Sequence, residues 1–234
     1  YGGGIWRSVD SGATWTQINS TARNYTGICM SNDGTKIYVC VKGGSIYYSA
    51  NALVTTPTFT EQNPSTDNQW TGVCCSSDGS TAYCAEQFAG IFKTTNSGTN
   101  WALSKAGDYA GIKRVRCSSD GAVVCAAVEN YTPSTPGGIL VSLDSGSTWN
   151  MRIGSGEWFD VSINRGGTSI IAFKGNGSTY KSKGLLADNL WETINIPLSY
   201  YSGIIADDGV LSVVISNGNA GYTQIGRASC RERV

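Results

Sequence analysis

Residues 142–149 read S-L-D-S-G-S-T-W, and residues 8–15 read S-V-D-S-G-A-T-W. A third copy at residues 94–101 reads T-T-N-S-G-T-N-W, with Asn96 in place of the aspartate. An Asp or Asn side chain can accept hydrogen bonds from backbone N–H groups two residues further on, and the following Gly supplies backbone freedom. These segments therefore predict tight turns.

The turn motif repeats along the chain. Two weaker copies end at Phe59 and Trp191, so that successive closing aromatic residues are 44, 42, 48 and 42 residues apart. The closing residues are Trp15, Phe59, Trp101, Trp149 and Trp191. A period of this length is typical of repeat architectures.

A second turn signal recurs in the other half of each repeat. It consists of Asp33-Gly34, Asp78-Gly79, Asp120-Gly121, Gly166-Gly167 and Asp208-Gly209. Such pairs supply the positive φ angles of a tight hairpin. Runs of β-branched and aromatic residues, such as residues 45–49 and 138–142, lie between the two signals and favour strands. One repeat therefore predicts four antiparallel strands, which is one blade of a β-propeller.

The S-x-D-x-G-x-T-W motif resembles the Asp box of the BNR-repeat β-propellers, a sialidase-like superfamily that includes xyloglucanases, sortilin-type receptors and a photosystem II assembly factor. We call residues 8–15, 94–101 and 142–149 the Asp-box turns. The resemblance covers residues 1–223 and implies an all-β fold, an incomplete ring of about five four-stranded blades. The expected blades are a partial one at 1–16, complete ones at 22–62, 66–105, 109–152 and 156–194, and a partial one at 198–223.

The C-terminal residues do not continue the repeat. Residues 225–234 read I-G-R-A-S-C-R-E-R-V, which matches the translation of a common sequencing adapter. We therefore expect residues 224–234 to be an artefact rather than native sequence, and we exclude them from the fold prediction.

Composition agrees with a β-rich fold and excludes several functions. Hydrophobic residues make up 40% and charged residues 15%, with 30 Gly and 5 Pro. The net charge is zero and there is no basic run, which disfavours a nucleic-acid partner. No apolar stretch approaches the length of a membrane span. There is no His and no C-x-x-C pair, so we predict no metal site and no cofactor.

The resemblance implies a structural role for the Asp-box turns, on the face opposite the usual binding site of the family. The residues assigned to this role are Ser8, Asp10, Gly12 and Trp15; Asn96, Gly98 and Trp101; and Ser142, Asp144, Gly146 and Trp149.

Seven cysteines precede the excluded segment. Cys29, Cys74, Cys75 and Cys117 come before the hairpin turn of their repeat, and Cys40, Cys84 and Cys125 come after it. Each hairpin could bring two cysteines together, which leaves disulfides open. The odd number and the small-residue positions favour buried thiols.

Aromatic residues open the first strand of most repeats. Tyr25, Trp70, Trp158 and Tyr200 lie eight residues before the turn Asp or Gly, and Tyr109 is an offset counterpart. Propeller geometry would place their rings around the channel mouth, where they could stack on sugars. The alternative, which the periodicity favours, is packing between blades.

Arg114 and Arg116 form a second candidate site. Alternation along the predicted strand puts both on one face, where two guanidinium groups would suit a carboxylate, sulfate or phosphate. The alternative is an ion pair with Glu129 or Asp160.

The sequence favours a non-enzymatic module that binds a glycan or a protein, and that is a monomeric propeller in its full-length parent. The predicted ligand-binding residues are Tyr25, Trp70, Tyr109, Arg114, Arg116, Trp158 and Tyr200. Two alternatives remain: a sialidase- or xyloglucanase-like glycoside hydrolase with part of its catalytic residues outside this chain, and an assembly factor. We assign no catalytic residue, because no sialidase-type arginine triad can be placed and a His-dependent triad cannot form. Glycosylation sequons at Asn19, Asn24, Asn130 and Asn176 weakly favour an extracellular or cell-surface location.

Overall fold

The structure is a computed structural model that describes residues 2–107, 111–129, 137–154, 156–175, 178–184, 191–194, 200–205 and 212–216. Within these ranges the chain forms β-strands and turns, without a helix. The strands make four four-stranded antiparallel sheets and two two-stranded ones. The described part of the chain therefore has no helix that could cross a membrane.

The sheets follow one another along the chain. The first, two-stranded sheet consists of β1 (Gly3–Arg7) and β2 (Thr16–Arg23). Three four-stranded sheets follow: β3 (Tyr25–Met30), β4 (Ile37–Val41), β5 (Ile46–Ser49) and β6 (Thr60–Gln62); β7 (Trp70–Cys75), β8 (Ala82–Glu86), β9 (Gly90–Thr94) and β10 (Ala102–Ala106); and β11 (Ile112–Cys117), β12 (Val124–Val128), β13 (Gly138–Ser142) and β14 (Asn150–Gly154). The fourth has β15 (Trp158–Ile163), β16 (Ile170–Lys174), β17 (Thr179–Ser182) and β18 (Trp191–Ile194), and a two-stranded sheet of β19 (Tyr200–Ile205) and β20 (Ser212–Ser216) ends the series.

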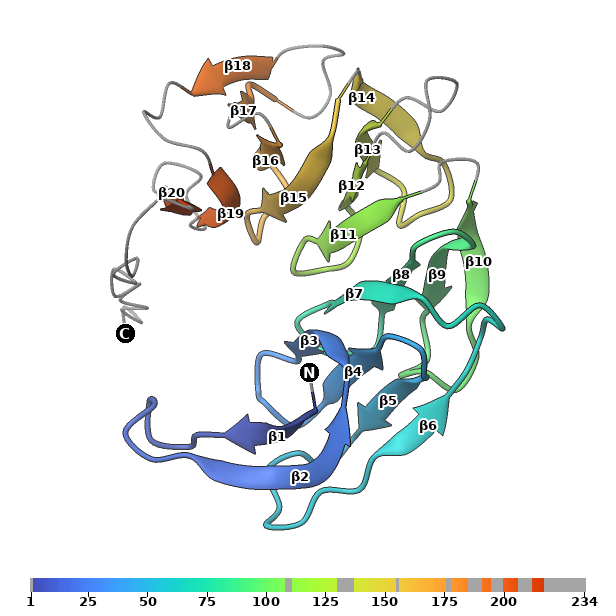
Figure 1. The fold of residues 1–234 in the computed structure, drawn as a ribbon, viewed down its shortest axis with the longest axis vertical. Helices are drawn as coiled ribbons and strands as arrows, with labels where there is room; N and C mark the ends of the chain where they lie inside the picture. The colour runs from blue at the N-terminus through green and yellow to red at the C-terminus, as the bar shows by residue number, and fades with distance from the viewer. Residues whose placement is uncertain are drawn as a thin grey trace.

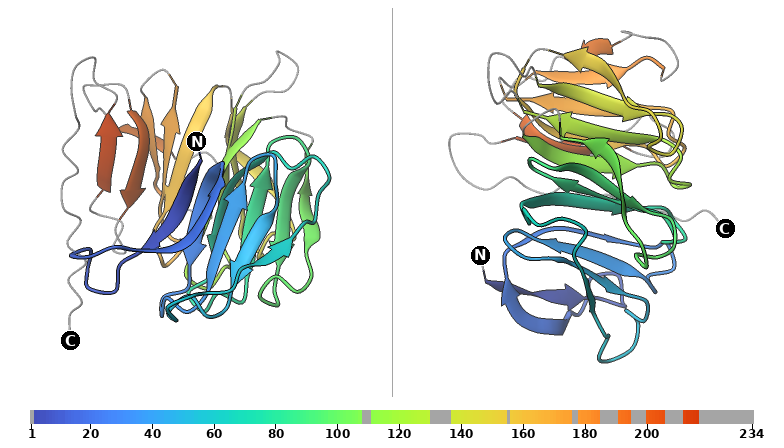
Figure 2. Two further views of the ribbon diagram at one scale, coloured as in Figure 1. Left: turned by 60° about the horizontal axis from the view of Figure 1, so that its bottom comes forward. Right: turned by 90° about the vertical axis from the view of Figure 1, so that its right-hand side faces the viewer.

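The sheets stand side by side in an arc, with the first strand of each at its inner edge (Figure 1). β3 lies beside β7, β7 beside β11, β11 beside β15, and β15 beside β19. The sheets are not closed into a ring: the sheet of β1 and β2 and the sheet of β19 and β20 stand apart at the two ends of the arc in Figure 1, and Figure 2 shows the same sheets from two further sides. The all-β propeller architecture predicted from the repeat is confirmed.

Each first strand carries the same irregularity near its start. The register shifts directly after Tyr25, Trp70, Ile112, Trp158 and Tyr200, and these residues pair with Val41, Glu86, Val128, Lys174 and Ser216. The equivalent position in the sheet that begins with β11 is therefore Ile112, and not Tyr109, which lies outside the described residues. A repeated bulge of this kind re-aims the side chain at the start of each first strand.

The hydrophobic core lies between neighbouring sheets rather than within one. One buried cluster joins Tyr83 and Ile91 of one sheet to Ile112 and Leu140 of the next. Equivalent clusters fill the spaces between the other neighbouring sheets. Because each central strand packs on both sides, β4, β8, β12 and β13 are buried along their full length.

Candidate functional site

The Asp-box turns lie on the same face of the arc as the hairpin turns between first and second strands. The backbone N–H of Ser97 donates to the carbonyl of Ser80 at 2.9 Å, and that of Ser145 donates to Ala122 at 2.8 Å. We call this the turn face. The opposite face carries the starts of the first strands and the turns between second and third strands.

Side-chain hydrogen bonds close each Asp-box turn. The Oδ1 atom of Asp144 accepts from the backbone N–H of Thr148 at 2.8 Å, and Oδ2 accepts from the Thr148 hydroxyl at 2.7 Å. Asp10 makes the same pair of bonds with Thr14, and the Asn96 side chain accepts from the backbone of Asn100. The acceptor thus reaches four residues ahead, where the sequence analysis expected two. These bonds hold the pKa of Asp10 and of Asp144 down to about 2.

The other residues of these turns complete the geometry. Ser142 accepts from the N–H of Gly146 at 2.8 Å, and Ser8 accepts from Gly12 at 2.7 Å. Positive φ angles occur at Ser11, Ser97 and Ser145 and at the glycines that follow them, Gly12, Gly98 and Gly146. The indole N–H of Trp149 donates to Ser104 and Gly146, that of Trp101 to Gln62, and that of Trp15 to Gly12. These hydrogen bonds support our interpretation that the Asp-box turns have a structural role.

The aromatic residues predicted to surround the channel mouth do not share one environment. Trp70 and Trp158 are fully buried between sheets, so neither ring offers a face to a ligand. Trp70 donates to the carbonyl of Gly44 at 3.1 Å, and its ring packs edge-on against Phe92. The Trp158 ring packs against Tyr180. Stacking of a sugar on these two tryptophans is excluded, because inter-sheet packing covers both sides of each ring.

Three predicted binding residues remain besides the arginines. Tyr25 is half-buried, and burial raises its pKa. The Tyr25 hydroxyl donates to the carbonyl of Thr21 at 2.9 Å. Tyr200 is described only as the first residue of β19, and Tyr109 lies outside the described residues.

The two predicted arginines, Arg114 and Arg116, lie on the first strand β11. The Nε atom of Arg114 is 3.2 Å from Oδ1 of the buried Asp160, so the ion-pair alternative holds for Arg114. Its neighbour Lys113 pairs with Glu129 at 2.5 Å. Arg116 donates to the carbonyl of Val115 at 3.2 Å. Arg114 is thus committed to a partner within the chain, which removes it from the anion site expected there.

A cavity of about 390 Å³ opens on the face opposite the turn face. Its lining consists of Gly3, Gly4, Arg23, Asn24, Tyr25, Thr26 and Lys42. The Arg23 guanidinium lies over the ring of Tyr47, 4.1 Å from its centroid, and donates to the Tyr47 hydroxyl. Thr26 donates to the carbonyl of Trp70 at 2.9 Å. We call this the basic cavity, since Arg23 and Lys42 supply two cations and its lining includes no acidic residue.

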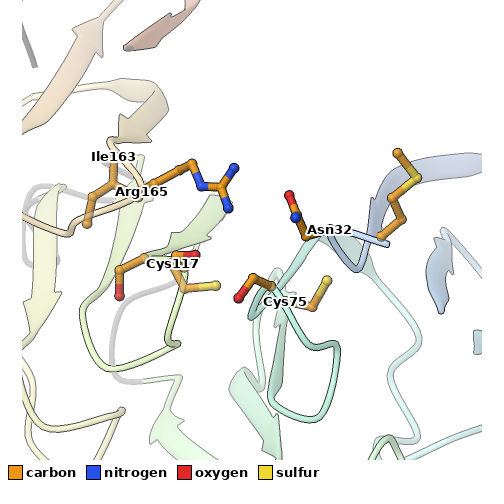
Figure 3. Close-up of a pocket in the computed structure, with 9 residues that line it drawn as sticks. Asn32, Cys75, Cys117, Ile163 and Arg165 are labelled. Carbon is orange, nitrogen blue, oxygen red and sulfur yellow. The ribbon is translucent and has the colours of Figure 1, made fainter. Parts of the chain in front are cut away.

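A second cavity, of about 260 Å³, lies at the inner edge of the arc on the turn face. Four first strands each contribute their last residue and the second residue of the turn that follows: Met30 and Asn32, Cys75 and Ser77, Cys117 and Ser119, and Ile163 and Arg165, with Ser118 completing the lining. Figure 3 shows Arg165 and Asn32 on opposite sides of this space, with Cys117 below Arg165 and Cys75 below Asn32 in this view. Backbone bonds from Asn32 to Ser77, Ser77 to Ser119, and Ser119 to Arg165 connect the turns that form it. We call this the thiol cavity.

All seven cysteines of the described residues are free thiols, so the hairpin disulfides left open by the sequence are absent there. Register explains this result. Cys29 lies opposite Tyr38, and Cys40 opposite Gly27, so the two cysteines of one hairpin do not face each other. Burial raises the pKa of Cys40 to about 11 and that of Cys84 well above its usual value.

The buried carboxylates have structural partners. Glu86 accepts hydrogen bonds from the backbone N–H groups of Gln69, Phe88 and Ala89, and Asp160 holds Arg114. Among the described residues, no group of three or more Cys, Asp or Glu side chains is placed to hold a metal ion.

Sequence reasoning named Tyr25, which lines the basic cavity, but predicted neither cavity. The basic cavity combines residues of β1, the end of β2 and the turn after β4, which only the fold brings together. The thiol cavity had a readable signal, because Cys75 and Cys117 occupy the same position of consecutive repeats, three residues before the turn aspartate.

Solved structures with similar folds are found, although no protein-family model and no curated protein matches the sequence. A crystal structure of a nidogen/laminin complex has a TM-score of 0.66 at 9% identity, covering 86% of this chain and 76% of that one. The GH74 enzyme of Niastella koreensis has a TM-score of 0.65 at 17% identity, covering 85% of this chain. The GH74 xyloglucanase of Xanthomonas campestris has a TM-score of 0.64 at 15% identity, covering 87%.

The chain spans 35% and 37% of the two GH74 enzymes, about a third of their length. Identities this low show the fold alone. The four-stranded antiparallel sheets, arranged in an arc around one inner edge, make the chain similar to β-propellers.

Proposed function

We propose that the chain is a non-catalytic binding module that takes an acidic glycan in the basic cavity, on the face opposite the Asp-box turns. The observation that carries the proposal is the lining of that cavity. It places the side chains of Arg23 and Lys42 beside Tyr25, in a space of about 390 Å³. This volume lies in the range of small-molecule sites.

The chemistry of the lining suits a sugar that carries a carboxylate or sulfate. Lys42 is exposed and Arg23 is held in place by Tyr47, so a fixed and a mobile cation are available to one anion. Tyr25 offers the apolar face on which a sugar ring can pack. Asn24 supplies an exposed amide that can bond ring hydroxyls. Gly3 leaves room for a ligand to approach the backbone of β1, since a Cβ atom placed there would meet nothing within 4 Å.

The hydrolase alternative has less support. Glycosidases of the common two-carboxylate type need a pair of acidic groups flanking the scissile bond. Neither of the two described cavities has an aspartate or glutamate in its lining, and Asp160 and Glu86 are committed to partners within the chain.

A binding titration tests the proposal. Sulfated and uronic-acid oligosaccharides, with neutral glucan oligosaccharides for comparison, would be titrated into the protein by isothermal calorimetry. We expect binding of the acidic compounds only, with affinity that falls as salt is raised. Lys42→Glu should weaken binding about tenfold or more, because it puts an anion against the ligand charge.

The matched control is Lys183→Glu. Lys183 is exposed and belongs to the turn face, where it pairs with Glu192 at 3.4 Å. This variant makes the same charge change at a distant surface and should leave the affinity within about twofold. Equal binding of neutral and acidic compounds, or equal effects of the two variants, would overturn the proposal. Turnover of the oligosaccharides would favour the hydrolase alternative.

A further inference from the structure

Four of the free thiols meet in pairs across the spaces between sheets. Consecutive residues of a strand point to opposite faces, so Cys74 and Cys75 on β7 face different neighbours. Burial, and after it the neighbouring Cys75 of β7, raises the pKa of the Cys29 thiol of β3; burial, and after it Cys117 of β11, raises that of Cys74. The same pairs share buried clusters, Cys29 and Cys75 in one and Cys74 and Cys117 in the next. Each pair therefore joins two adjacent sheets.

The inner strands approach closely enough for these pairs to bond. A Cβ atom placed on Gly27 of β3 would lie 3.0 Å from the backbone nitrogen of Val73 on β7. A Cβ atom on Gly72 would lie 3.7 Å from the backbone nitrogen of Val115 on β11. Both glycines lie two residues before a paired cysteine. Disulfides need Cα atoms roughly 4.4–6.8 Å apart, a separation that is met only where two strands pack this closely.

One thiol of each pair is reachable from solvent. Cys75 and Cys117 line the thiol cavity, which has a volume of about 260 Å³ (Figure 3). The exposed Arg165 lines the same cavity and attracts anionic reagents toward it. The partners Cys29 and Cys74 are not part of the cavity lining; Cys74 is buried and Cys29 half-buried, and burial raises the pKa of both thiols well above the usual value. The cavity thiols are therefore the ones that react first.

We propose that Cys29–Cys75 and Cys74–Cys117 are two redox modification sites, at which a small anionic disulfide of the glutathione type converts each thiol pair into a disulfide that joins adjacent sheets. This inference concerns a different cavity and is independent of the proposed glycan site.

The reaction balances as two exchanges. The thiolate of Cys75 attacks one sulfur of the small disulfide, which forms a mixed disulfide and releases one small thiolate. Cys29 then loses its proton to water and attacks the Cys75 sulfur, which releases the second small thiol. The protein pair is oxidised by two electrons, and one small disulfide is reduced to two thiols. Cys117 and Cys74 react in the same way, and the raised pKa of Cys29 and of Cys74 makes the second exchange the slow step in both.

The test is oxidation of the reduced, folded chain with oxidised glutathione at mildly alkaline pH, followed by intact-mass measurement and non-reducing peptide mapping. We expect transient glutathione adducts, then a species that has lost four hydrogens. The map should show peptides cross-linked through Cys29–Cys75 and Cys74–Cys117. The thermal midpoint should rise by roughly 5–10 °C, because each crosslink closes a long loop. Dithiothreitol should reverse both changes.

Each pair serves as the control for the other. Cys29→Ala should abolish the first crosslink and keep the second, and Cys74→Ala should do the reverse. Cys125→Ala, at a buried thiol of the second strand β12, should keep both. Arg165→Glu should slow oxidation by glutathione several-fold but leave oxidation by the uncharged 2-hydroxyethyl disulfide unchanged. Stable glutathione adducts without crosslinks, or crosslinks within one hairpin such as Cys29–Cys40, would overturn the proposal.

Discussion

The Nε atom of Arg114 lies 3.2 Å from the Oδ1 atom of Asp160, across the space between β11 and β15. The carboxylate side of this pair is 2% exposed and the guanidinium side 31%. Asp160 also accepts from the N–H of Val161 at 2.9 Å. The pair therefore connects two first strands at the inner edge of the arc, with a buried anion that depends on hydrogen-bond donors.

Removing the cation should destabilise the protein. We expect Arg114→Ala to lower the free energy of unfolding by about 2 kcal/mol, because the buried Asp160 carboxylate loses a charged donor. Lys183→Ala, which breaks the exposed pair with Glu192, should cost less than about 0.5 kcal/mol. Urea unfolding of both variants makes the comparison. Equal losses would mean that the Arg114–Asp160 pair contributes no more than a surface pair.

The buried indoles of Trp70 and Trp158 offer a second comparison. Trp70 donates to Gly44, whereas the indole nitrogen of Trp158 has no hydrogen-bond partner among the described residues. Trp→Phe at either position removes similar volume from a fully buried site. Trp70→Phe should therefore cost about 1 kcal/mol more than Trp158→Phe, measured by urea unfolding. A larger loss at Trp158 would contradict this assignment of hydrogen bonds.

The repeat period was enough to predict the architecture, because four strands and two turn types recur at a nearly constant spacing. The eight-residue spacing that identified Tyr25 and Trp70 leads from Asp120 to Ile112, yet the search for an aromatic residue favoured Tyr109. The eight-residue spacing therefore predicts the equivalent position correctly, whereas the requirement for an aromatic residue selects the wrong one. The burial of Trp70 could not be read from one repeat, since the neighbouring sheet supplies half of its contacts.

The cysteine pairs also depend on contacts between sheets, which one repeat of the sequence does not reveal. Within one repeat, Cys29 and Cys40 look like natural partners across a hairpin. The structure instead places Cys29 and Cys75 in one cluster, because alternate residues of a first strand face the two neighbouring sheets rather than the second strand of their own sheet. The offset between adjacent first strands is a property of how the sheets pack, and local sequence does not encode it.

Acid should destabilise the fold over a defined interval. Hydrogen bonds in the turns lower the pKa of Asp10, Asp33, Asp78 and Asp144 from 3.8 to about 2. A folded-state pKa below the unfolded value contributes stability that is complete above about pH 4 and is lost as pH falls toward 2. Thermal midpoints measured across this interval should fall with pH. Asp33→Asn, which keeps an acceptor but does not titrate, should make the fall smaller; an unchanged slope would contradict the role of these turns.

The Asp-box turns at residues 8–15 and 142–149 contain the same hydrogen bond, which is exposed in the first and buried in the second. Comparing them shows how burial changes the free energy lost when this bond is removed. Ser142 is 0% exposed, and its hydroxyl accepts from the buried N–H of Gly146 at 2.8 Å. Ser8 makes the equivalent bond to Gly12 at 2.7 Å, but there the group is exposed to water. Ser142→Ala leaves a buried N–H without its acceptor and should cost about 1–3 kcal/mol in urea unfolding. Ser8→Ala lets water replace the hydroxyl and should cost less than about 1 kcal/mol. If the two losses are equal, the turn geometry and not burial sets the strength of this bond.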